Sequence, residues 1–397
     1  MRAQRALALA ALAALAPAAA AASPAAPARA VAATNQVQAL WVAWTDGAAG
    51  AAATQRAAAD ACAARGFTTV RFAASPYWPD DWALLAANAT EFWARAAAGM
   101  DALVAGGCTS LVPSLFWNIF SLPDLHGEPL GALARGARGG ASAAFAAQLQ
   151  YIDDFVGRFR GYPIAAWELN NEMNLIVDID QSETCNSCSV PRGTPAARSR
   201  ADNISTADAA AIHGAWAQRV RAADGRGRPV SSGNAIARPA AEHLRASYLL
   251  PSRDWTPDTF AQFSRNLADA HACCEWVSQH VYPGPDNARW GVVGPADGAI
   301  VHYLQAAVAA AGAGKRLFIG EFGQLPAANA SAAAPRPFVD AVLAALAAPA
   351  PPGVPGITAA ALAWTWEFAD MNATWALWPG ATQGVIDALQ AFNSRAE

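Results

Sequence analysis

Residues 162–172 read Tyr-Pro-Ile-Ala-Ala-Trp-Glu-Leu-Asn-Asn-Glu, an apolar run of strand length that ends on a carboxylate. A second run of this kind, Arg-Leu-Phe-Ile-Gly-Glu-Phe-Gly at 316–323, brings Glu321 to its end. If both strands belong to one parallel barrel, Glu172 and Glu321 face each other across its mouth. Taken singly, each acid fits an exposed loop equally well, so the rest of the chain has to decide.

Strand-like and helix-like segments alternate along the remainder of the chain. Strands are expected near 37–44 and at 68–73, 110–116, 162–169, 229–232, 276–281, 317–320 and 357–366. Helices are expected at 54–65, 81–105, 142–160, from Ser205 onward, 257–272, 296–311, 334–347 and 382–393. This alternation predicts an α/β fold with one catalytic domain, the (β/α)8 TIM barrel. A doubly wound open sheet would need a Gly-rich phosphate loop after the first strand, and residues 47–50 do not form one.

Polar and aromatic side chains gather at the carboxyl ends of the expected strands. They are Arg71; Trp117 and Asn118; Asn171 and Glu172; His280 and Tyr282; Glu321; Trp364 and Trp366. In a (β/α)8 barrel these ends share one face, so the pattern predicts a single site. Two opposed carboxylates can cleave a glycosidic bond, because one protonates the leaving oxygen while the other attacks the anomeric carbon.

The composition is that of a folded protein with a large core. Of the 397 residues, 54% are hydrophobic and 15% are charged, which argues against disorder. The formal net charge is −4 and basic residues do not cluster, so nucleic acid is not an expected partner.

The N-terminus is typical of a secretion signal over residues 1–22, and its Ala/Pro-rich leader can extend to residue 30. Arg2 and Arg5 precede an apolar stretch at 6–16 that is too short to span a membrane. We therefore expect a secreted protein, extracellular or periplasmic, with its catalytic domain at 31–397 and no membrane association.

The cysteines suit an oxidising compartment, because their number, six, is even. Cys62 and Cys108 end the first two expected helices, one unit apart at the bottom of a barrel, so a disulfide is expected between them. Cys185–Cys188 is a Cys-x-x-Cys pair without further zinc ligands nearby, which favours a small local disulfide. The adjacent cysteines at 273–274 fit either a vicinal disulfide or two buried thiols.

The 15 tryptophans add a second indication, because sugar rings pack their C–H faces on indole. Those in or near expected top loops are candidates for such contacts: Trp78, Trp82, Trp117 and Trp290. Those expected in the core or between helices are Trp41, Trp93 and Trp216.

In this order, the motifs resemble the clan of retaining β-glycosidases that includes glycoside hydrolase family 5, the cellulase and β-mannanase family. The segments that carry the resemblance are Gly-Phe-Thr-Thr-Val-Arg-Phe at 66–72, Trp-Glu-Leu-Asn-Asn-Glu at 167–172, Gln-His-Val-Tyr at 279–282, Gly-Glu-Phe-Gly at 320–323 and Ala-Trp-Thr-Trp at 363–366. They run through nearly the whole mature chain.

The resemblance implies Glu321 as nucleophile and Glu172 as acid/base. Arg71 and Tyr282 would stabilise the Glu321 charge and lower its pKa, and the charge of Glu321 would raise the pKa of Glu172. The remaining residues expected to bind substrate are Asn118, Asn171, His280, Trp364 and Trp366, with Asn171 on the sugar 2-hydroxyl and Trp364 under the −1 subsite. Such a mechanism needs neither metal nor cofactor.

One segment departs from the family pattern and leaves the sugar open. Many cellulases of the family carry a histidine after the third strand, whereas residues 112–118 read Val-Pro-Ser-Leu-Phe-Trp-Asn, closer to the mannanase type. The leading hypothesis is a secreted, monomeric, retaining endo-β-1,4-glycanase that acts on mannan or glucan. Its alternatives are an exo-acting β-glycosidase on oligosaccharides or small glycosides, and a non-catalytic carbohydrate-binding barrel.

Overall fold

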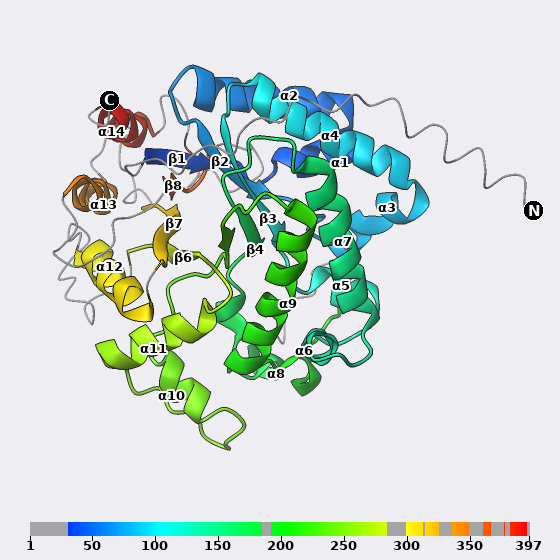
Figure 1. Ribbon diagram of the computed structural model, residues 1–397, viewed down its shortest axis with the longest axis vertical. Coiled ribbons are helices and arrows are strands. Elements are labelled where there is room, and N and C mark those ends of the chain that lie inside the picture. The colour runs from blue at the N-terminus through cyan, green and yellow to red at the C-terminus, as the bar shows by residue number, and fades with distance from the viewer. Residues whose placement is uncertain are drawn as a thin grey trace, which may run out of the picture.

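The computed structural model describes residues 31–184, 192–283, 299–312, 314–324, 336–348, 360–366, 377 and 382–394. Within these ranges the strands close into a parallel barrel in the order β1 to β8, with helices around it (Figure 1). The strands are β1 Val31–Asn35, β2 Thr69–Ala73, β3 Ser110–Phe116, β4 Trp167–Asn170, β5 Val230–Ser231, β6 Trp276–Val281, β7 Arg316–Phe322 and β8 Ala360–Ala363. The predicted (β/α)8 fold is confirmed.

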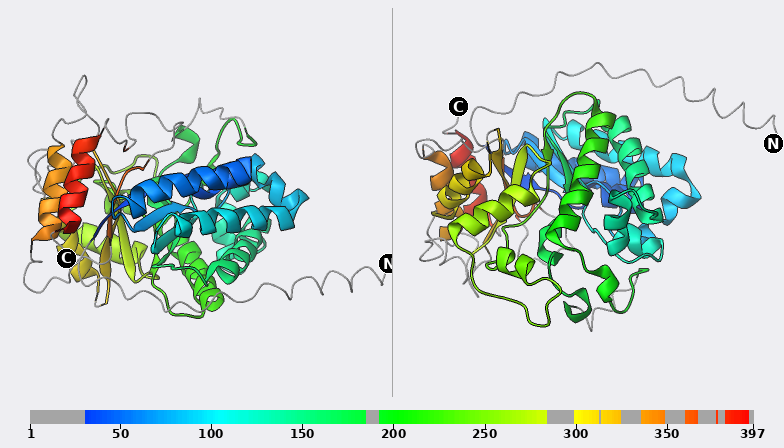
Figure 2. Two further views of the ribbon diagram at one scale, coloured as in Figure 1. Left: turned by 90° about the horizontal axis from the view of Figure 1, so that it is seen from above. Right: turned by 60° about the horizontal axis from the view of Figure 1, so that its bottom comes forward.

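The helices between the strands pack on the outside of the barrel, as Figure 2 shows from two further directions. They are α1 Ala39–Asp46, α2 Ala48–Ala58, α3 Ala83–Ala87, α4 Ala89–Ala105, α5 Ser121–Leu125, α6 Gly131–Ala137, α7 Ala143–Phe159, α8 Gln181–Thr184, α9 Thr206–Asp224, α10 Ala241–Ala246, α11 Phe260–Ala270, α12 Ala299–Ala311, α13 Pro337–Ala347 and α14 Gln383–Ser394. Among these helices, none has both the length and the apolar character needed to cross a membrane.

The first strand is where the sequence-based assignment is wrong. The segment 37–44, expected as a strand, lies mostly in α1, and β1 precedes it at Val31–Asn35. α1 buries Ala39, Leu40, Ala43 and Trp44, whose spacing is helical. The strand itself reads Val-Ala-Ala-Thr-Asn, which differs little from the Ala-rich leader before it.

An apolar layer fills the lower part of the barrel. It consists of Ala33, Val112, Ala166, Trp276, Phe318 and Leu362, all of them buried. Residues two positions further along a strand face the same side. The next layer up therefore receives Asn35 from β1, Ser114 from β3 and Glu168 from β4, which are buried and polar. The candidate site thus rests on a dry apolar floor.

A bulge in β7 turns Glu321 into the barrel. Gln279 of β6 pairs with Ile319, but the next residue, His280, pairs with Glu321, so Gly320 is an extra residue in β7. Regular alternation would place Phe318 inside and Glu321 outside. The extra residue reverses the alternation, as bulges near active sites often do, and Glu321 joins Phe318 on the inner side.

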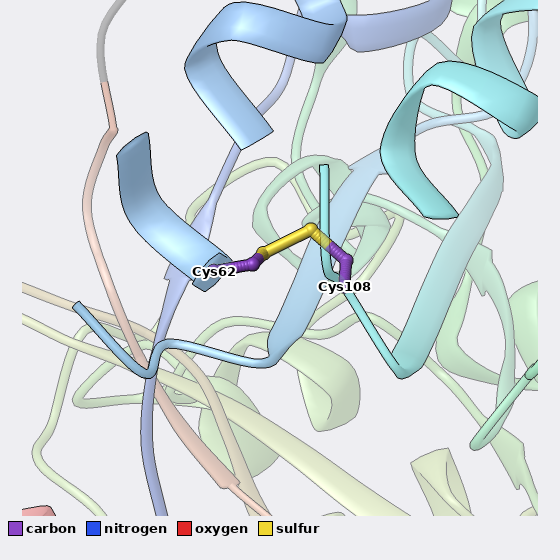
Figure 3. Close-up of a disulfide and its surroundings, with 2 residues drawn as sticks. All are labelled: Cys62 and Cys108. Atoms are coloured by element: carbon purple, nitrogen blue, oxygen red, sulfur yellow. A yellow bond between two sulfur atoms is a disulfide. The ribbon is translucent and has the colours of Figure 1, made fainter. Parts of the chain in front are cut away.

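The predicted Cys62–Cys108 disulfide is confirmed (Figure 3). Cys62 lies in the turn that continues α2, and Cys108 lies between α4 and β3, with a Cα–Cα distance of 5.2 Å. Cys273 and Cys274 are free thiols that form no disulfide, and their sulfur atoms share a hydrogen bond at 2.7 Å. The pair Cys185–Cys188 lies outside the described residues, as does the predicted signal segment.

Candidate active site

Arg71 is at the centre of the site. It points inward from β2, is fully buried, and stacks with its guanidinium carbon 4.3 Å from the ring centre of Trp117. Its hydrogen bonds reach four acceptors: Glu168 Oε1 at 2.6 Å, Glu321 Oε1 at 2.7 Å, Asn171 Oδ1 at 2.7 Å and Asn35 Oδ1 at 3.0 Å. Burial opposes the charge, but the two carboxylates outweigh it and raise the pKa of Arg71 above its ordinary value.

Both carboxylate oxygens of Glu321 accept hydrogen bonds. Besides Arg71, the Tyr282 hydroxyl donates to Oε2 at 2.7 Å. Burial raises the pKa of Glu321, and Glu172 adds to the rise, whereas His280, Arg71 and the Tyr282 hydroxyl oppose it. As expected, Arg71 and the Tyr282 hydroxyl lower the pKa of Glu321, but removing the carboxylate from water is the larger effect, so the pKa is raised overall.

Glu172 lies just beyond β4 in a left-handed backbone conformation, with φ 54° and ψ 27°. Its amide donates to Gly233 O at 2.8 Å, which holds this strained turn in place. The pKa of Glu172 is raised, as expected, but burial is its main cause, and Arg71 opposes the rise. A raised pKa suits a group that has to hold a proton until it is needed.

His280 joins the two acids. Its Nδ1 lies 2.9 Å from Glu172 Oε1 and 3.3 Å from Glu321 Oε1. Burial lowers the pKa of His280 to about 4, so the ring is neutral near pH 7. With Nδ1 between two carboxyl groups, the proton belongs on Nδ1, and Nε2 has no hydrogen-bond partner among the described residues.

The two acids are close together. One oxygen each from Glu172 and Glu321 and one nitrogen of His280 all lie within 4.8 Å of one another. That spacing would also suit a metal ion. However, these atoms already bond to each other, to Arg71 and to Tyr282, so we read them as hydrogen-bonded carboxyl groups.

A cavity of about 510 Å³ opens in front of the acids. Its aromatic lining consists of Trp41, Tyr77, Trp78, Trp117, Tyr282 and Trp364. The polar lining includes Gln38, Ser75, Asn171, Glu172 and Glu321. Aromatic walls with a few polar groups are typical of sites for small organic ligands. A second cavity of about 40 Å³, beside Asn234 and Arg238, is too small for a sugar.

Most of the predicted site residues lie at the cavity of about 510 Å³. The side-chain oxygen of Asn171 accepts a hydrogen bond from Arg71, so the side-chain nitrogen of Asn171 is available to a ligand in the cavity. Trp364 lines the cavity and stacks with Trp117, with ring centres 6.2 Å apart. His280 lies behind the carboxylates, and Tyr282 lines the wall.

Two predicted residues lie elsewhere. Asn118 does not line the cavity; its amide donates to Tyr77 O at 2.9 Å, so it supports a residue that does. Trp366 is fully buried beside Phe67, on the far side of the strand from Trp364. Residues two positions apart on a strand face the same side, and Trp364 and Trp366 depart from that rule because β8 ends at Ala363.

The tryptophan assignments divide in the same way. Trp78 and Trp117 line the cavity as expected, whereas Trp82 is buried and donates to Ser121 Oγ at 2.6 Å. Trp41 was expected in the core or between helices but lines the cavity, where its indole N–H donates to Asp81 at 3.2 Å. Trp93 and Trp216 are buried as expected, and Trp290 lies outside the described residues.

Sequence reasoning missed Glu168, Asn35 and Tyr77. Glu168 and Asn35 bond to Arg71, and Tyr77 lines the cavity. Glu168 belongs to the motif quoted first, two residues after the inward-facing Ala166, so strand alternation could have revealed it. Tyr77 follows β2 in a loop without a pattern, and no signal in the sequence marks it.

No protein-family model and no curated protein matches this chain. Among solved structures, the endo-beta-1,4-mannanase from Thermotoga petrophila is similar with a TM-score of 0.55 and 14% identity, over 94% of this chain and 78% of that one. The endo-1,4-beta-D-mannanase from Thermotoga petrophila RKU-1 has a TM-score of 0.54 and 14% identity, over 91% and 99%. GH5_18 from Streptomyces cattleya, in complex with GlcNAc, has a TM-score of 0.52 and 16% identity, over 93% of this chain and 82% of that one. The chain shares their fold.

Proposed function

We propose that this protein is a retaining glycoside hydrolase related to family 5. The observation that carries the proposal is the separation of its two acids, since oxygens of Glu172 and Glu321 lie within 4.8 Å of each other. Retaining enzymes hold their carboxyl groups about 5–5.5 Å apart, whereas inverting enzymes need about 6.5–9.5 Å to admit a water molecule. The aromatic cavity in front of the acids supports a sugar as substrate.

In the first step, Glu321 attacks the anomeric carbon while Glu172 gives its proton to the leaving oxygen. The glycosidic C–O bond breaks as an ester bond to Glu321 forms, and the leaving sugar departs as an alcohol. Arg71 and Tyr282 hold the two oxygens of Glu321 in place before attack. The Asn171 amide, turned to the cavity by Arg71, would bond to the sugar 2-hydroxyl.

In the second step, Glu172 takes a proton from water, and the water oxygen attacks the anomeric carbon. The ester bond breaks, Glu321 leaves as a carboxylate, and the anomeric configuration is restored. Burial raises the pKa of Glu172 in the free enzyme. The two carboxylates also repel each other, and esterification removes the negative charge of Glu321. The pKa of Glu172 therefore falls when it has to act as a base.

The substrate we propose is a β-1,4-linked mannan or glucan, cleaved internally. Two of the similar structures are named as endo-mannanases, and the cavity volume of about 510 Å³ is large for one sugar ring. Exo-action on oligosaccharides uses the same residues and is the alternative. We further propose that the protein is exported and that it acts as a monomer. The Cys62–Cys108 disulfide supports export, because such bonds persist in oxidising compartments.

The test is reducing-end release from a panel of β-mannan, glucomannan, carboxymethyl cellulose, mixed-linkage glucan, β-1,3-glucan and xylan. Release that is lost in Glu321→Ala and in Glu172→Ala, but kept in the control Glu91→Ala, whose side chain is 45% exposed beside Arg95, is the expected result. Proton NMR of the first product should show the β-anomer. A folded protein that releases nothing from polymers or aryl glycosides would overturn the proposal.

A further inference from the structure

Glu168 is a buried carboxylate with no place in the two-step reaction. Its side chain is fully inaccessible, and it lies 2.6 Å from Arg71 Nε, with Ser231 Oγ at 3.4 Å from its second oxygen. A buried carboxylate is costly unless it is paired. Arg71 is its partner, and Arg71 also bonds Glu321 at 2.7 Å.

The local charge balance is unusual. One guanidinium, Arg71, faces three carboxyl groups, those of Glu168, Glu172 and Glu321, while His280 is neutral. Without Glu168, the full positive charge of Arg71 would act on the other two acids. An opposite charge within about 4–6 Å lowers a carboxyl pKa by about 1–3 units, which would release the proton that Glu172 has to keep.

We propose that Glu168 is a positioning residue that neutralises Arg71, so that Arg71 can hold Glu321 and Asn171 without removing the proton from Glu172. The catalytic role of Glu168 rests on the proposed function, but the electrostatic effect of Glu168 on Glu172 does not depend on the substrate. Glu168 also fixes the direction of the guanidinium, because its bond to Nε leaves both terminal nitrogens for Asn35, Glu321 and Asn171.

The backbone supports the same link. Gly233 has φ 76°, and a Cβ there would lie 3.0 Å from the Glu168 carboxyl carbon and 1.6 Å from Asn170 O. The carbonyl of Gly233 accepts the amide of Glu172 at 2.8 Å. Glu168 and the turn that carries Glu172 are therefore packed against one glycine.

Glu168→Gln separates charge from shape, because glutamine keeps an oxygen for Arg71 Nε and loses only the negative charge. In the described parts of the chain, the charged and titratable groups that face Glu172 are Arg71 from β2, His280 from β6, Tyr282 just after β6, Glu321 from β7, and Tyr77 from the loop after β2. β3 and β5 face Glu168 with Ser114 and Ser231, which carry no charge. Removing the charge of Glu168 is thus the main electrostatic change.

The experiment is a carboxyl 13C NMR titration of the full-length protein labelled at glutamate, with Glu172→Gln and Glu321→Gln used to assign the signals. In Glu168→Gln the titration midpoint of Glu172 should fall by about one pH unit, and in activity both limbs of the kcat/KM profile should move to lower pH. The control is Asp224→Asn, which uncharges an equally buried acid 2.6 Å from Arg228 and should leave Glu172 unchanged.

An unmoved Glu172 midpoint in folded Glu168→Gln would overturn the proposal. If that variant does not fold, the wild-type titration still decides, because Glu168 has to show the chemical shift of an ionised carboxylate at pH 7, and a neutral Glu168 would refute its role. The titration needs no substrate. A wild-type protein that cleaves no glycoside would therefore refute the proposed function while leaving the titration result intact.

Discussion

Replacing Gly320 by alanine should impair the site more than the fold. Gly320 is the extra residue of the β7 bulge, and a Cβ there would lie 2.8 Å from His280 Nε2 and 2.9 Å from Ser278 Oγ. Its φ is not in the left-handed region, so alanine meets no backbone strain, only these contacts. Ordinary contacts begin at 3.4 Å, so Nε2 has to retreat by about 0.6 Å.

The retreat pushes the opposite edge of the ring toward the acids. Nδ1 of His280 already lies 2.9 Å from Glu172 Oε1 and 3.3 Å from Glu321 Oε1. A misplacement of about 1 Å at a reacting group costs about 100-fold in rate, so roughly half that shift should lower kcat/KM by about 10-fold. Overpacking of this kind costs about 1–3 kcal/mol, which lowers Tm by about 4 °C.

The assay compares kcat/KM on the best substrate and Tm for Gly320→Ala and two control variants. Gly157 in α7 and Gly214 in α9 have no atoms within 4 Å of an added Cβ. Alanine at either position should leave kcat/KM unchanged and stabilise the protein by about 0.5–1 kcal/mol. If Gly320→Ala keeps the kcat/KM and Tm of the wild type, the close packing of His280 against β7 does not matter for activity, and the prediction is refuted.

Further predictions concern single contacts. Tyr282→Phe removes the donor 2.7 Å from Glu321 Oε2; a hydrogen bond to a charged group contributes about 1.5–3 kcal/mol, so kcat/KM should fall by about 10–100-fold, and an unchanged value would exclude a role for the hydroxyl. The double variant Cys62→Ser/Cys108→Ser opens a loop with a sequence separation of 46. It should lose about 4 kcal/mol by loop entropy, seen as a lower Tm; an unchanged Tm would contradict this. Burial lowers the pKa of His213 to about 3 and of His271 and His280 to about 4, against an ordinary 6.5. The folded state disfavours their protonated form, so this stability is present above pH 6.5 and is lost as pH falls toward 4, and a Tm that stays flat over that range would refute it.

The carboxyl ends of the strands were more predictable than their starts, and more predictable than which strand residues point into the barrel. β3 and β6 have the bounds expected from the sequence, 110–116 and 276–281, and α9 begins after its capping residue Ser205 as expected. β1 was missed because Val-Ala-Ala-Thr-Asn offers little hydrophobic contrast to the alanines before it. A strand of a closed barrel forms between two neighbours, and that support is absent from its own sequence.

The acids were predictable as a pair, but their surroundings were not. Glu172 and Glu321 stand out because each follows an apolar run, and Arg71, His280 and Tyr282 follow from the same reasoning. The bulge at Gly320 depends on register between β6 and β7, which only the folded barrel defines. Trp41 was expected in the core or between helices, in a segment assigned as a strand; the segment is instead α1, and its Trp41 lines the cavity.

The exposure of the two acids gives an independent reason for their roles. The Glu321 side chain is 5% exposed, sits directly above the apolar layer, and has both oxygens engaged by Arg71 and Tyr282. The Glu172 side chain is 31% exposed, and its carboxylate is held by a contact to the neutral ring of His280 at 2.9 Å. A nucleophile benefits from fixed oxygens and exclusion of water, since its attack is on a carbon brought to it. An acid/base has to reach the leaving oxygen and later a water molecule, so it has to remain open to solvent. Exposure therefore supports, independently of the distance between the acids, the proposal that Glu321 is the nucleophile and Glu172 the proton carrier.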